Sequence, residues 1–281
     1  MKTLKASLIT ESVSELCVLA NIDLRGDVLS KLKAAATGEN SKRAREILQA
    51  IVNNAKVAKK KRLAICQDTG MPCVFVEIGQ DVRVKGDLKA GIIKGVESGY
   101  KKGFLRNSIV SHPLLRTAPA YLPPVIHIDI VKGSNLKLTV LPKGFGCENK
   151  TQLKMFTPTT GIEEIKGFIV GIIKSAGPDA CPPYVVGVGI GGTADYACLL
   201  AKKALLRRVH SPQSTVHSQG IKKIEGELLR EINALNIGPM GLGGKTTALA
   251  VNIETYATHI AGLPVAVNIS CHALRSATAV L

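Results

Sequence analysis

The 281-residue sequence contains no tryptophan and only ten aromatic residues, five tyrosines and five phenylalanines. Proteins that hold single-stranded nucleic acid stack the bases on aromatic side chains, and such platforms would be sparse here. No apolar run approaches the roughly 18 residues that would cross a bilayer. Glu11 and Glu15 interrupt any signal-peptide core near the N-terminus. We therefore expect a cytoplasmic protein that has neither a membrane nor a nucleic acid as its partner.

Charge of one sign is abundant, because 37 lysines and arginines face 21 acidic residues and give a net charge of +16. Nucleic acid is the usual partner of so basic a protein, yet no zinc-finger, RNA-recognition or KH-type motif is present. The densest basic run, Lys59–Arg62, follows a helical stretch, where cations offset the negative end of the helix dipole. The remaining excess fits a small polyanionic substrate, an acidic partner subunit, or both. A basic nucleic-acid-binding or scaffold protein without catalytic activity is the alternative.

The order of the predicted elements indicates a mixed α/β protein. The first 60 residues have helical periodicity, with Ser41 as the N-cap of one helix. Strands and helices alternate after residue 66, and Asp87 is predicted to cap a helix that runs through Lys101. Two strands, Pro124–Val131 and Leu136–Leu141, are separated by a short glycine-containing turn, which predicts a hairpin. We expect two lobes, at about 1–157 and 158–281, with the helical N-terminal segment followed by mixed sheets flanked by helices.

The second lobe has its own alternation. Residues 161–175 are predicted as a helix, 184–190 as a buried strand, and Thr193 as the cap of a helix that runs to residue 206. Another helix is expected at 219–235. The segment 246–259 fits a strand or a helix, and Pro264–Ile269 is a strand that ends just before Cys271.

Two glycine motifs resemble nucleotide-binding loops. Gly187–Gly192 fits GxGxxG between a strand and a helix, but the dinucleotide fingerprint needs an acidic residue about 20 positions later, where Arg207 and Arg208 stand. Close packing of strand on helix is the other interpretation, with N–H groups at the helix start available to an anion. The loop before Lys245 lacks the first glycine of a P-loop, because Pro239 occupies that place. The interpretation of this chain as a nucleotide-dependent enzyme therefore depends on the match at Gly187–Gly192 alone.

Seven cysteines are present, an odd number that indicates reduced thiols with metal or catalytic roles rather than a disulfide framework. Cys66, Cys181 and Cys271 each stand in a loop with polar neighbours. They are 115 and 90 residues apart, too far for a zinc finger or a ferredoxin-type run. Three thiolates gathered only by the fold would suit an iron–sulfur cluster with one open iron, which binds a hydroxyl or carboxylate as a Lewis acid.

His259 lies a few residues before the strand that leads to Cys271, and both a structural and a proton-transfer role stay open for it. His272 adjoins Cys271 and either supports that residue or belongs only to the loop.

Four segments, taken in order, resemble the class I fumarate hydratase family: Cys66–Gly70, Gly144–Lys150, Cys181–Pro183 with Gly191–Thr193, and Asn268–His272. The resemblance runs from about residue 10 to the C-terminus. It is to the N-terminal, cluster-carrying domain, which is the α subunit in two-subunit members, and the α subunit of L-tartrate dehydratase is a close relative. The whole chain, 1–281, would be this domain.

The resemblance implies a 4Fe–4S cluster with Cys66, Cys181 and Cys271 as ligands and one iron open to the substrate. It leaves the other four cysteines outside the ligand set: Cys17, Cys73, Cys147 and Cys198. The residues that it implies for substrate binding and catalysis are Gln67 and Asp68 at the C2 end of the substrate, Arg106 at a carboxylate, the backbone around Gly146, and His259 in proton transfer.

The implied reaction is the reversible hydration of fumarate to (S)-malate. Tartrate dehydration to oxaloacetate is the alternative, and fumarate is favoured only because its metabolic role is commoner. Single-chain family members continue into a second domain with further substrate-binding residues, whereas this sequence ends ten residues after Cys271. We therefore expect a separate β subunit, an α2β2 assembly, and activity only when both subunits are present.

Overall fold

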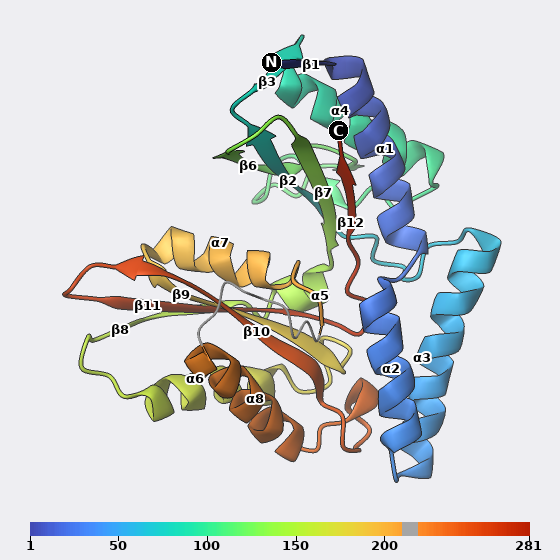
Figure 1. Cartoon of the computed structure of the whole chain (residues 1–281). Helices are drawn as coiled ribbons and strands as arrows, with labels where there is room; N and C mark the ends of the chain where they lie inside the picture. Colours follow the sequence, from blue (N-terminus) through green and yellow to red (C-terminus); the bar gives the residue numbers. More distant parts are fainter. Residues whose placement is uncertain (210–218) are drawn as a thin grey trace. The chain divides into compact units, whose positions relative to one another are not determined.

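The computed structural model describes residues 1–209 and 219–281 and divides the chain into two compact units (Figure 1). Unit 1 comprises Met1–Arg25, Asn54–Phe145 and Arg275–Leu281, and unit 2 comprises Gly26–Asn53 and Gly146–Leu274. Each unit has a four-stranded sheet with helices packed on it. The predicted mixed α/β class is thereby confirmed.

Unit 1 is built on a sheet with the strand order β12-β7-β2-β6. Helices α1 and α4 pack on each other, and α1 also contacts β7 and β12. Small strand pairs lie outside this sheet, β1 with β3 and β4 with β5. The elements are β1 (Lys2–Lys5), α1 (Ala6–Ile22), β2 (Met71–Gly79), β3 (Val82–Lys85), α4 (Leu88–Lys102), β4 (Ile109–Val110), β5 (Pro119–Ala120), β6 (Val125–Val131), β7 (Leu136–Lys143) and β12 (Ala277–Val280).

The predicted hairpin between β6 and β7 is wrong, because β2 lies between these two strands. β2 pairs in parallel with β6 and antiparallel with β7. The connecting turn crosses the end of β2, where Gly79 N–H donates to Asn135 O at 2.9 Å and Asp81 N–H donates to Gly133 O at 3.0 Å. Gly79 has no room for a side chain there, since a Cβ would meet the carbonyl oxygen of Gly133.

Unit 2 has the sheet order β10-β9-β11-β8. Helices α6 and α8 contact each other and the strands β11 and β10 respectively, while α7 contacts β9, β10 and β11. The elements of this unit are α2 (Gly26–Gly38), α3 (Lys42–Lys61), α5 (Phe145–Glu148), β8 (Gln152–Phe156), α6 (Ile162–Ala176), β9 (Tyr184–Gly192), α7 (Ala194–Ala204), α8 (Gln219–Ala234), the 3-10 turn η1 (Pro239–Gly241), β10 (Ala248–Thr258) and β11 (Leu263–Ser270). The end of α3 after Asn53 and the first residue of α5, Phe145, are assigned to unit 1.

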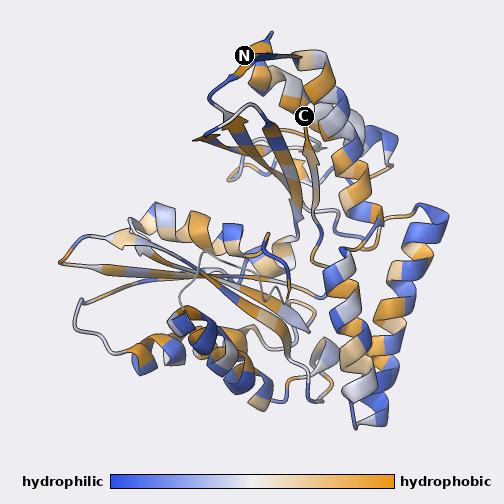
Figure 2. Cartoon of the chain, viewed as in Figure 1, coloured by the Kyte–Doolittle hydropathy of each residue, from blue (hydrophilic) through white to orange (hydrophobic). Residues whose placement is uncertain are grey.

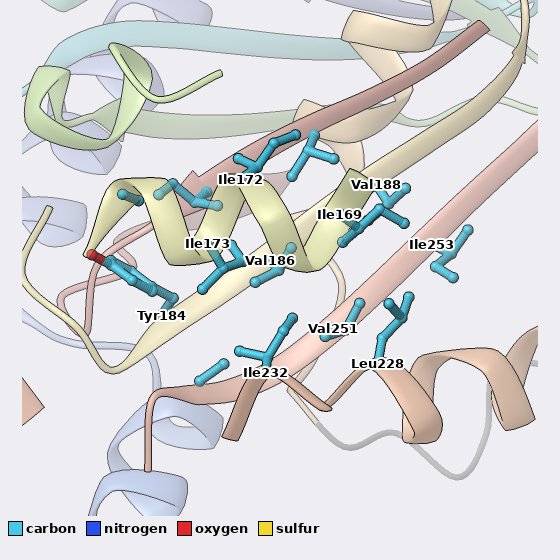
Figure 3. Close-up of a cluster of buried hydrophobic side chains, with 14 of the residues drawn as sticks. Ile169, Ile172, Ile173, Tyr184, Val186, Val188, Leu228, Ile232, Val251 and Ile253 are labelled. Carbon is cyan, nitrogen blue, oxygen red and sulfur yellow. The ribbon is translucent and has the colours of Figure 1, made fainter. Parts of the chain in front are cut away.

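Apolar side chains of α6, α8 and the central strands form the core of unit 2 (Figure 3). Ile169 and Ile173 of α6, Val186 of β9, and Leu228 and Ile232 of α8 are all buried there. Figure 2 shows hydrophobic residues concentrated in the strands, while the helices alternate between hydrophobic and hydrophilic stripes, as expected when one face of each is buried. The segment 246–259, which fitted a strand or a helix, forms β10 and pairs in parallel with β9.

The predicted helix starts are present. Ser41 Oγ accepts from the N–H of Ala44 at 3.4 Å, and the side chain of Asp87 accepts from the N–H of Ala90 at 2.9 Å. The run Lys59–Lys61 forms the last turn of α3. Over residues 1–209 and 219–281, no helix is both long and apolar enough to span a bilayer.

Candidate functional site

The loop that carries Cys66 belongs to unit 1 and is held at both ends by buried groups. Ile65 N–H donates to the backbone oxygen of Asn21 at 2.9 Å. The Tyr100 hydroxyl lies 2.9 Å from Thr69 O and 3.1 Å from Gly70 O. Gly70 has φ +75°, and a Cβ on it would lie 2.6 Å from the Pro142 carbonyl carbon, so only glycine fits. The backbone is thereby fixed, while the Cys66 side chain stays partly exposed.

Asp68 joins this loop to the start of the Gly144–Lys150 segment. Its Oδ1 accepts from Gly70 N–H and its Oδ2 from Phe145 N–H, both at 2.9 Å. Gly144 leaves space beside the carboxylate, since a Cβ there would stand 3.3 Å from Oδ2. Each carboxylate oxygen has more than one lone pair, so both remain able to accept a further hydrogen bond.

Arg106 is tied to the same loop through its backbone. Thr69 Oγ1 accepts from the N–H of Arg106 at 3.0 Å and donates to its carbonyl oxygen at 3.3 Å. The side chains of Arg106 and Gln67 are exposed, and Asp68 is half-buried. Unit 1 therefore brings together four of the predicted site residues, Cys66, Gln67, Asp68 and Arg106, on two backbone segments joined by the Thr69 hydroxyl.

Unit 2 brings Cys181 and Cys271 together. Cys271 follows β11, and the next residue, His272, approaches the carbonyl oxygen of Cys181 with its backbone N–H at 3.4 Å and its Nδ1 at 3.0 Å. Because a carbonyl oxygen only accepts, Nδ1 carries the proton in this contact. Cys181 itself has φ +58°, a strained conformation for a non-glycine residue. His272 therefore contacts Cys181, whereas the sequence suggested support of Cys271, the cysteine beside it, as one of its two roles.

The exposure of the thiols separates the predicted ligands from most other cysteines. Cys66, Cys181 and Cys271 are partly exposed. Cys17 is buried, and burial raises the pKa of its thiol to about 12, which keeps it protonated. Cys73 and Cys147 are also buried, while Cys198 on α7 is partly exposed and its pKa is raised, chiefly by desolvation. Reactive or metal-binding thiols need access and a thiolate, and the partial exposure of the three predicted ligands meets the first of these conditions.

The three predicted ligands are divided between the units, Cys66 in unit 1 and the other two in unit 2. Within neither unit, over the described residues, do three His, Cys, Asp or Glu side chains form a metal-binding group. Cys147 adjoins the pair in unit 2, because its Sγ donates to the carbonyl oxygen of Ala180, the residue before Cys181, at 3.3 Å.

Gly146 and His259 both belong to unit 2. Gly146 is exposed on the short helix α5. His259 is exposed in the turn between β10 and β11, and its Nδ1 accepts from Ala261 N–H at 3.1 Å. The eight residues of β11 separate it from Cys271 by roughly 26 Å. His259 instead lines a cavity of about 440 Å³ with Tyr196 and Tyr256. The structure therefore does not bring His259 to the cysteine pair of its own chain.

The glycine motifs have structural roles. A Cβ on Gly189 would meet Ala197 O and would lie 2.6 Å from Ala201 N, which confirms the close packing of β9 on α7. The first turn of α7 already holds a carboxylate, because the Thr193 hydroxyl donates to Asp195 at 2.6 Å and lowers the pKa of that carboxyl, with backbone N–H groups adding to the effect. The anion at this helix start is therefore the carboxylate of Asp195, a residue of the helix itself.

The glycine loop before Lys245 also faces an internal carboxylate. The backbone N–H of Lys245 donates to Oε2 of Glu39 at 2.8 Å, and Glu39 is only 2% exposed. Its Oε1 accepts from the N–H groups of Asn40 and Ser41. This arrangement agrees with the rejection of a P-loop.

Comparison with known proteins decides the family. The model of the family described as fumarate hydratase (Fumerase) matches residues 10–280. This chain belongs to the fumarate hydratase family. A Methanocaldococcus jannaschii protein provisionally named L(+)-tartrate dehydratase subunit alpha is 42% identical over 279 residues, which cover 96% of each chain. The L(+)-tartrate dehydratase subunit alpha of Escherichia coli K12 is 30% identical over 274 residues, 96% of this chain and 89% of the relative.

The fumarate hydratase match spans both units and includes every predicted site residue from Cys66 to Cys271. Sequence reasoning missed the buried polar groups beneath the Cys66 loop. Asn21, Tyr100 and Arg275 are 0%, 1% and 3% exposed. Single polar residues within apolar stretches follow no motif, so only the fold shows that they share one site.

Proposed function

We propose that this chain is the cytoplasmic α subunit of an iron–sulfur hydro-lyase that converts fumarate and water reversibly to (S)-malate. Family membership supports a hydro-lyase, and the names of the relatives support an α subunit that works with a partner. The observation that carries the proposal is the convergence of the Cys66 loop, Arg106 and the Asp68–Phe145 contact in unit 1. Dehydration of L-tartrate to oxaloacetate is the second candidate, favoured by the names of those relatives.

The proposed cofactor is a 4Fe–4S cluster with Cys66, Cys181 and Cys271 as its ligands. Support comes from the partial exposure of all three thiols and from the His272 contact that pairs two of them. When bound, such a cluster supplies an iron without a protein ligand, a Lewis acid that makes the C2 hydroxyl a better leaving group.

The residues of this chain would bind and orient the substrate. Elimination requires loss of a proton from C3 and of hydroxide from C2, so the two carbons have to be held in one geometry. Arg106 has a planar guanidinium on a fixed backbone, which suits a bidentate contact to a substrate carboxylate. Asp68 would accept from the C2 hydroxyl, with its orientation set by two backbone N–H groups. Gln67 and the backbone at Gly146 would complete the wall.

We assign His259 to proton transfer, on one condition. Because β11 separates it from Cys271 by roughly 26 Å in the same unit, His259 would act in the site of a second α chain. An α2β2 assembly supplies that second chain. The separate β subunit would contribute the remaining carboxylate-binding groups and the base that removes the C3 proton. The whole chain, 1–281, would serve as the cluster-carrying domain, in two lobes.

A turnover assay with both subunits tests this function. The chain is purified without oxygen, alone and with its candidate β subunit, and supplied separately with fumarate, (S)-malate and L-tartrate. We expect turnover only from the complex, with fumarate and malate preferred. Preference for tartrate would select the second candidate. Absence of turnover with all three substrates, together with salt-sensitive binding to nucleic acid, would favour the non-catalytic alternative.

A further inference from the structure

Three buried polar side chains, Asn21, Tyr100 and Arg275, lie next to the Cys66 loop. Arg275 is the charged one, and no step of the proposed reaction uses it. We propose that Arg275 is a positioning residue that holds the Cys66 and Asp68 side chains in place, acting through Asn21 and across Gly144. This inference deepens the proposed function and rests on it for its catalytic consequence.

Asn21 is the hub of this group. Its backbone oxygen accepts from Ile65 N–H at 2.9 Å, at the start of the loop. Its side chain donates to Cys17 O at 3.0 Å, and it lies close enough to the Tyr100 hydroxyl to act on that group's pKa, which it lowers. That hydroxyl in turn contacts the carbonyl oxygens at the far end of the loop, Thr69 O and Gly70 O. Both ends of the segment that presents Cys66, Gln67 and Asp68 therefore depend on one asparagine.

Arg275 orients the hub. Its Nη1 donates to Asn21 Oδ1 at 3.2 Å, which fixes which end of the amide points toward Tyr100. Burial raises the pKa of the Tyr100 hydroxyl, so this group stays a donor to the loop. Arg275 is 3% exposed, and its Nε has no hydrogen-bond partner among the residues that the structure describes. A buried charge with an unmet donor lowers stability, so its presence calls for a role beyond packing.

The guanidinium also faces the other wall of the site. The point that a Cβ on Gly144 would occupy lies 3.3 Å from Asp68 Oδ2 and 3.7 Å from Arg275 Nη2. The carboxylate and the guanidinium therefore approach the same small space, which glycine leaves empty. Attraction between these opposite charges favours the position in which Asp68 accepts from Phe145 N–H.

Arg275 stands only four residues after Cys271 and opens the segment Arg275–Leu281, with which the chain returns to unit 1. Arg275 thus supports the Cys66 loop through Asn21 and is also the first residue of unit 1 after Cys271, another expected ligand. A change at Arg275 should disturb Cys66 and Asp68 before it disturbs the rest of unit 1.

The test uses the full chain without cluster or partner, so its readout does not depend on activity. Iodoacetamide alkylation of Cys66 is followed by peptide mass spectrometry, with amide hydrogen exchange of residues 64–70, in wild type, Arg275→Met and Arg275→Lys. We expect Arg275→Met to raise the Cys66 alkylation rate roughly tenfold, the factor associated with losing a hydrogen bond from a charged donor. In Arg275→Lys, Cys66 should be alkylated more slowly than in Arg275→Met, because a lysine ammonium still reaches Asn21 although it lacks the second guanidinium nitrogen that faces Gly144.

Lys166→Met is the matched control, because Lys166 is also a nearly buried cation, 6% exposed, but ion-pairs with Glu227 and Glu231 between α6 and α8 of unit 2. It should lower thermal stability without changing Cys66 alkylation. If Arg275→Met fails to fold, Tyr100→Phe removes the same support from the far end of the loop and should also speed alkylation. Wild-type alkylation and exchange in these variants would overturn the proposal.

The catalytic consequence is measured separately in the complex with the β subunit. Arg275→Lys should lower kcat much more than it raises KM, because Arg106 still binds substrate while Asp68 is misplaced. An inactive wild-type complex would refute the proposed function and leave the alkylation result standing as a test of the positioning role.

Discussion

His272 holds the carbonyl oxygen of Cys181 through its Nδ1 at 3.0 Å, so the residue after one expected cluster ligand fixes the backbone of another. The contact crosses 91 residues of sequence. Together with the backbone N–H of His272, it brings the loop after β11 against the loop before β9. A metal ligand held in this way needs less reorganisation when the metal binds.

Replacing His272 tests that support. His272→Ala removes the side-chain bond, and we expect the loaded protein to lose iron about 10-fold faster, the scale seen when a hydrogen bond that supports a metal ligand is deleted. His272→Asn keeps a donor near the same place and should lose iron more slowly than the alanine variant. Iron release to a chelator under anaerobic conditions measures both. Equal rates of iron release from wild type and His272→Ala would show that His272 does not support the cluster ligands.

Asp68→Asn separates binding from chemistry. The amide nitrogen cannot accept from either Gly70 N–H or Phe145 N–H, so one of the two contacts is lost. We expect kcat in the complex to fall about 10²- to 10⁴-fold, the usual contribution of a positioned acid or base, with the iron content unchanged. Glu97→Gln is the control, since Glu97 pairs with Lys101 on the surface of α4. Wild-type turnover in Asp68→Asn would contradict the role given to this carboxylate.

The packing of β9 on α7 predicts a large effect from one methyl group. Gly189→Ala places its Cβ against the backbone of Ala197 and Ala201, and we expect it to destabilise the protein by about 1–3 kcal/mol. Gly167→Ala is the matched substitution, because nothing lies within 4 Å of a Cβ there and α6 should gain about 1 kcal/mol of helix propensity. Urea unfolding measures both free energies. Equal stability of the two variants would show that the glycine motif serves something other than packing.

Burial of Cys17 predicts a specific dependence of stability on pH. The thiol has a pKa of about 12 in the folded chain against an ordinary value of 9.0, so the unfolded chain loses this proton first. The stabilisation is complete below about pH 9 and is lost as pH rises toward 12, at up to about 1.4 kcal/mol per pH unit. Unfolding free energies of wild type and Cys17→Ala, compared across this range, should converge as pH rises. A difference that does not change with pH would refute the assignment.

Several parts of the fold followed from local rules. The caps at Ser41 and Asp87 and the strand before Cys271 were predictable because each depends on residues close in sequence. The hairpin prediction failed because the turn between β6 and β7 hydrogen-bonds to the end of β2, an element more than 50 residues earlier. The residues of a short turn do not indicate that another strand will lie between the two that it connects.

The candidate site was predictable only in part. The loops around Cys66, Cys181 and Cys271 could be recognised from their polar residues. The residues that support the Cys66 loop could not, because Asn21, Tyr100 and Arg275 come from three distant segments. The position of His259 was not predicted. It is only 12 residues before Cys271 in the sequence, which suggested that the two side chains are close, but the extended strand β11 lies between them and holds them apart.

Anaerobic reconstitution of the full chain with iron and sulfide tests whether Cys66, Cys181 and Cys271 hold a cluster. We expect a brown protein that binds four irons and four sulfides per chain, and loss of this chromophore in each of Cys66→Ser, Cys181→Ser and Cys271→Ser. Cys198→Ser, a partly exposed thiol outside the proposed set, should keep it. A wild-type chain that stays colourless, or a Cys66→Ser variant that assembles the full cluster, would show that these three cysteines are not the ligands of such a cluster.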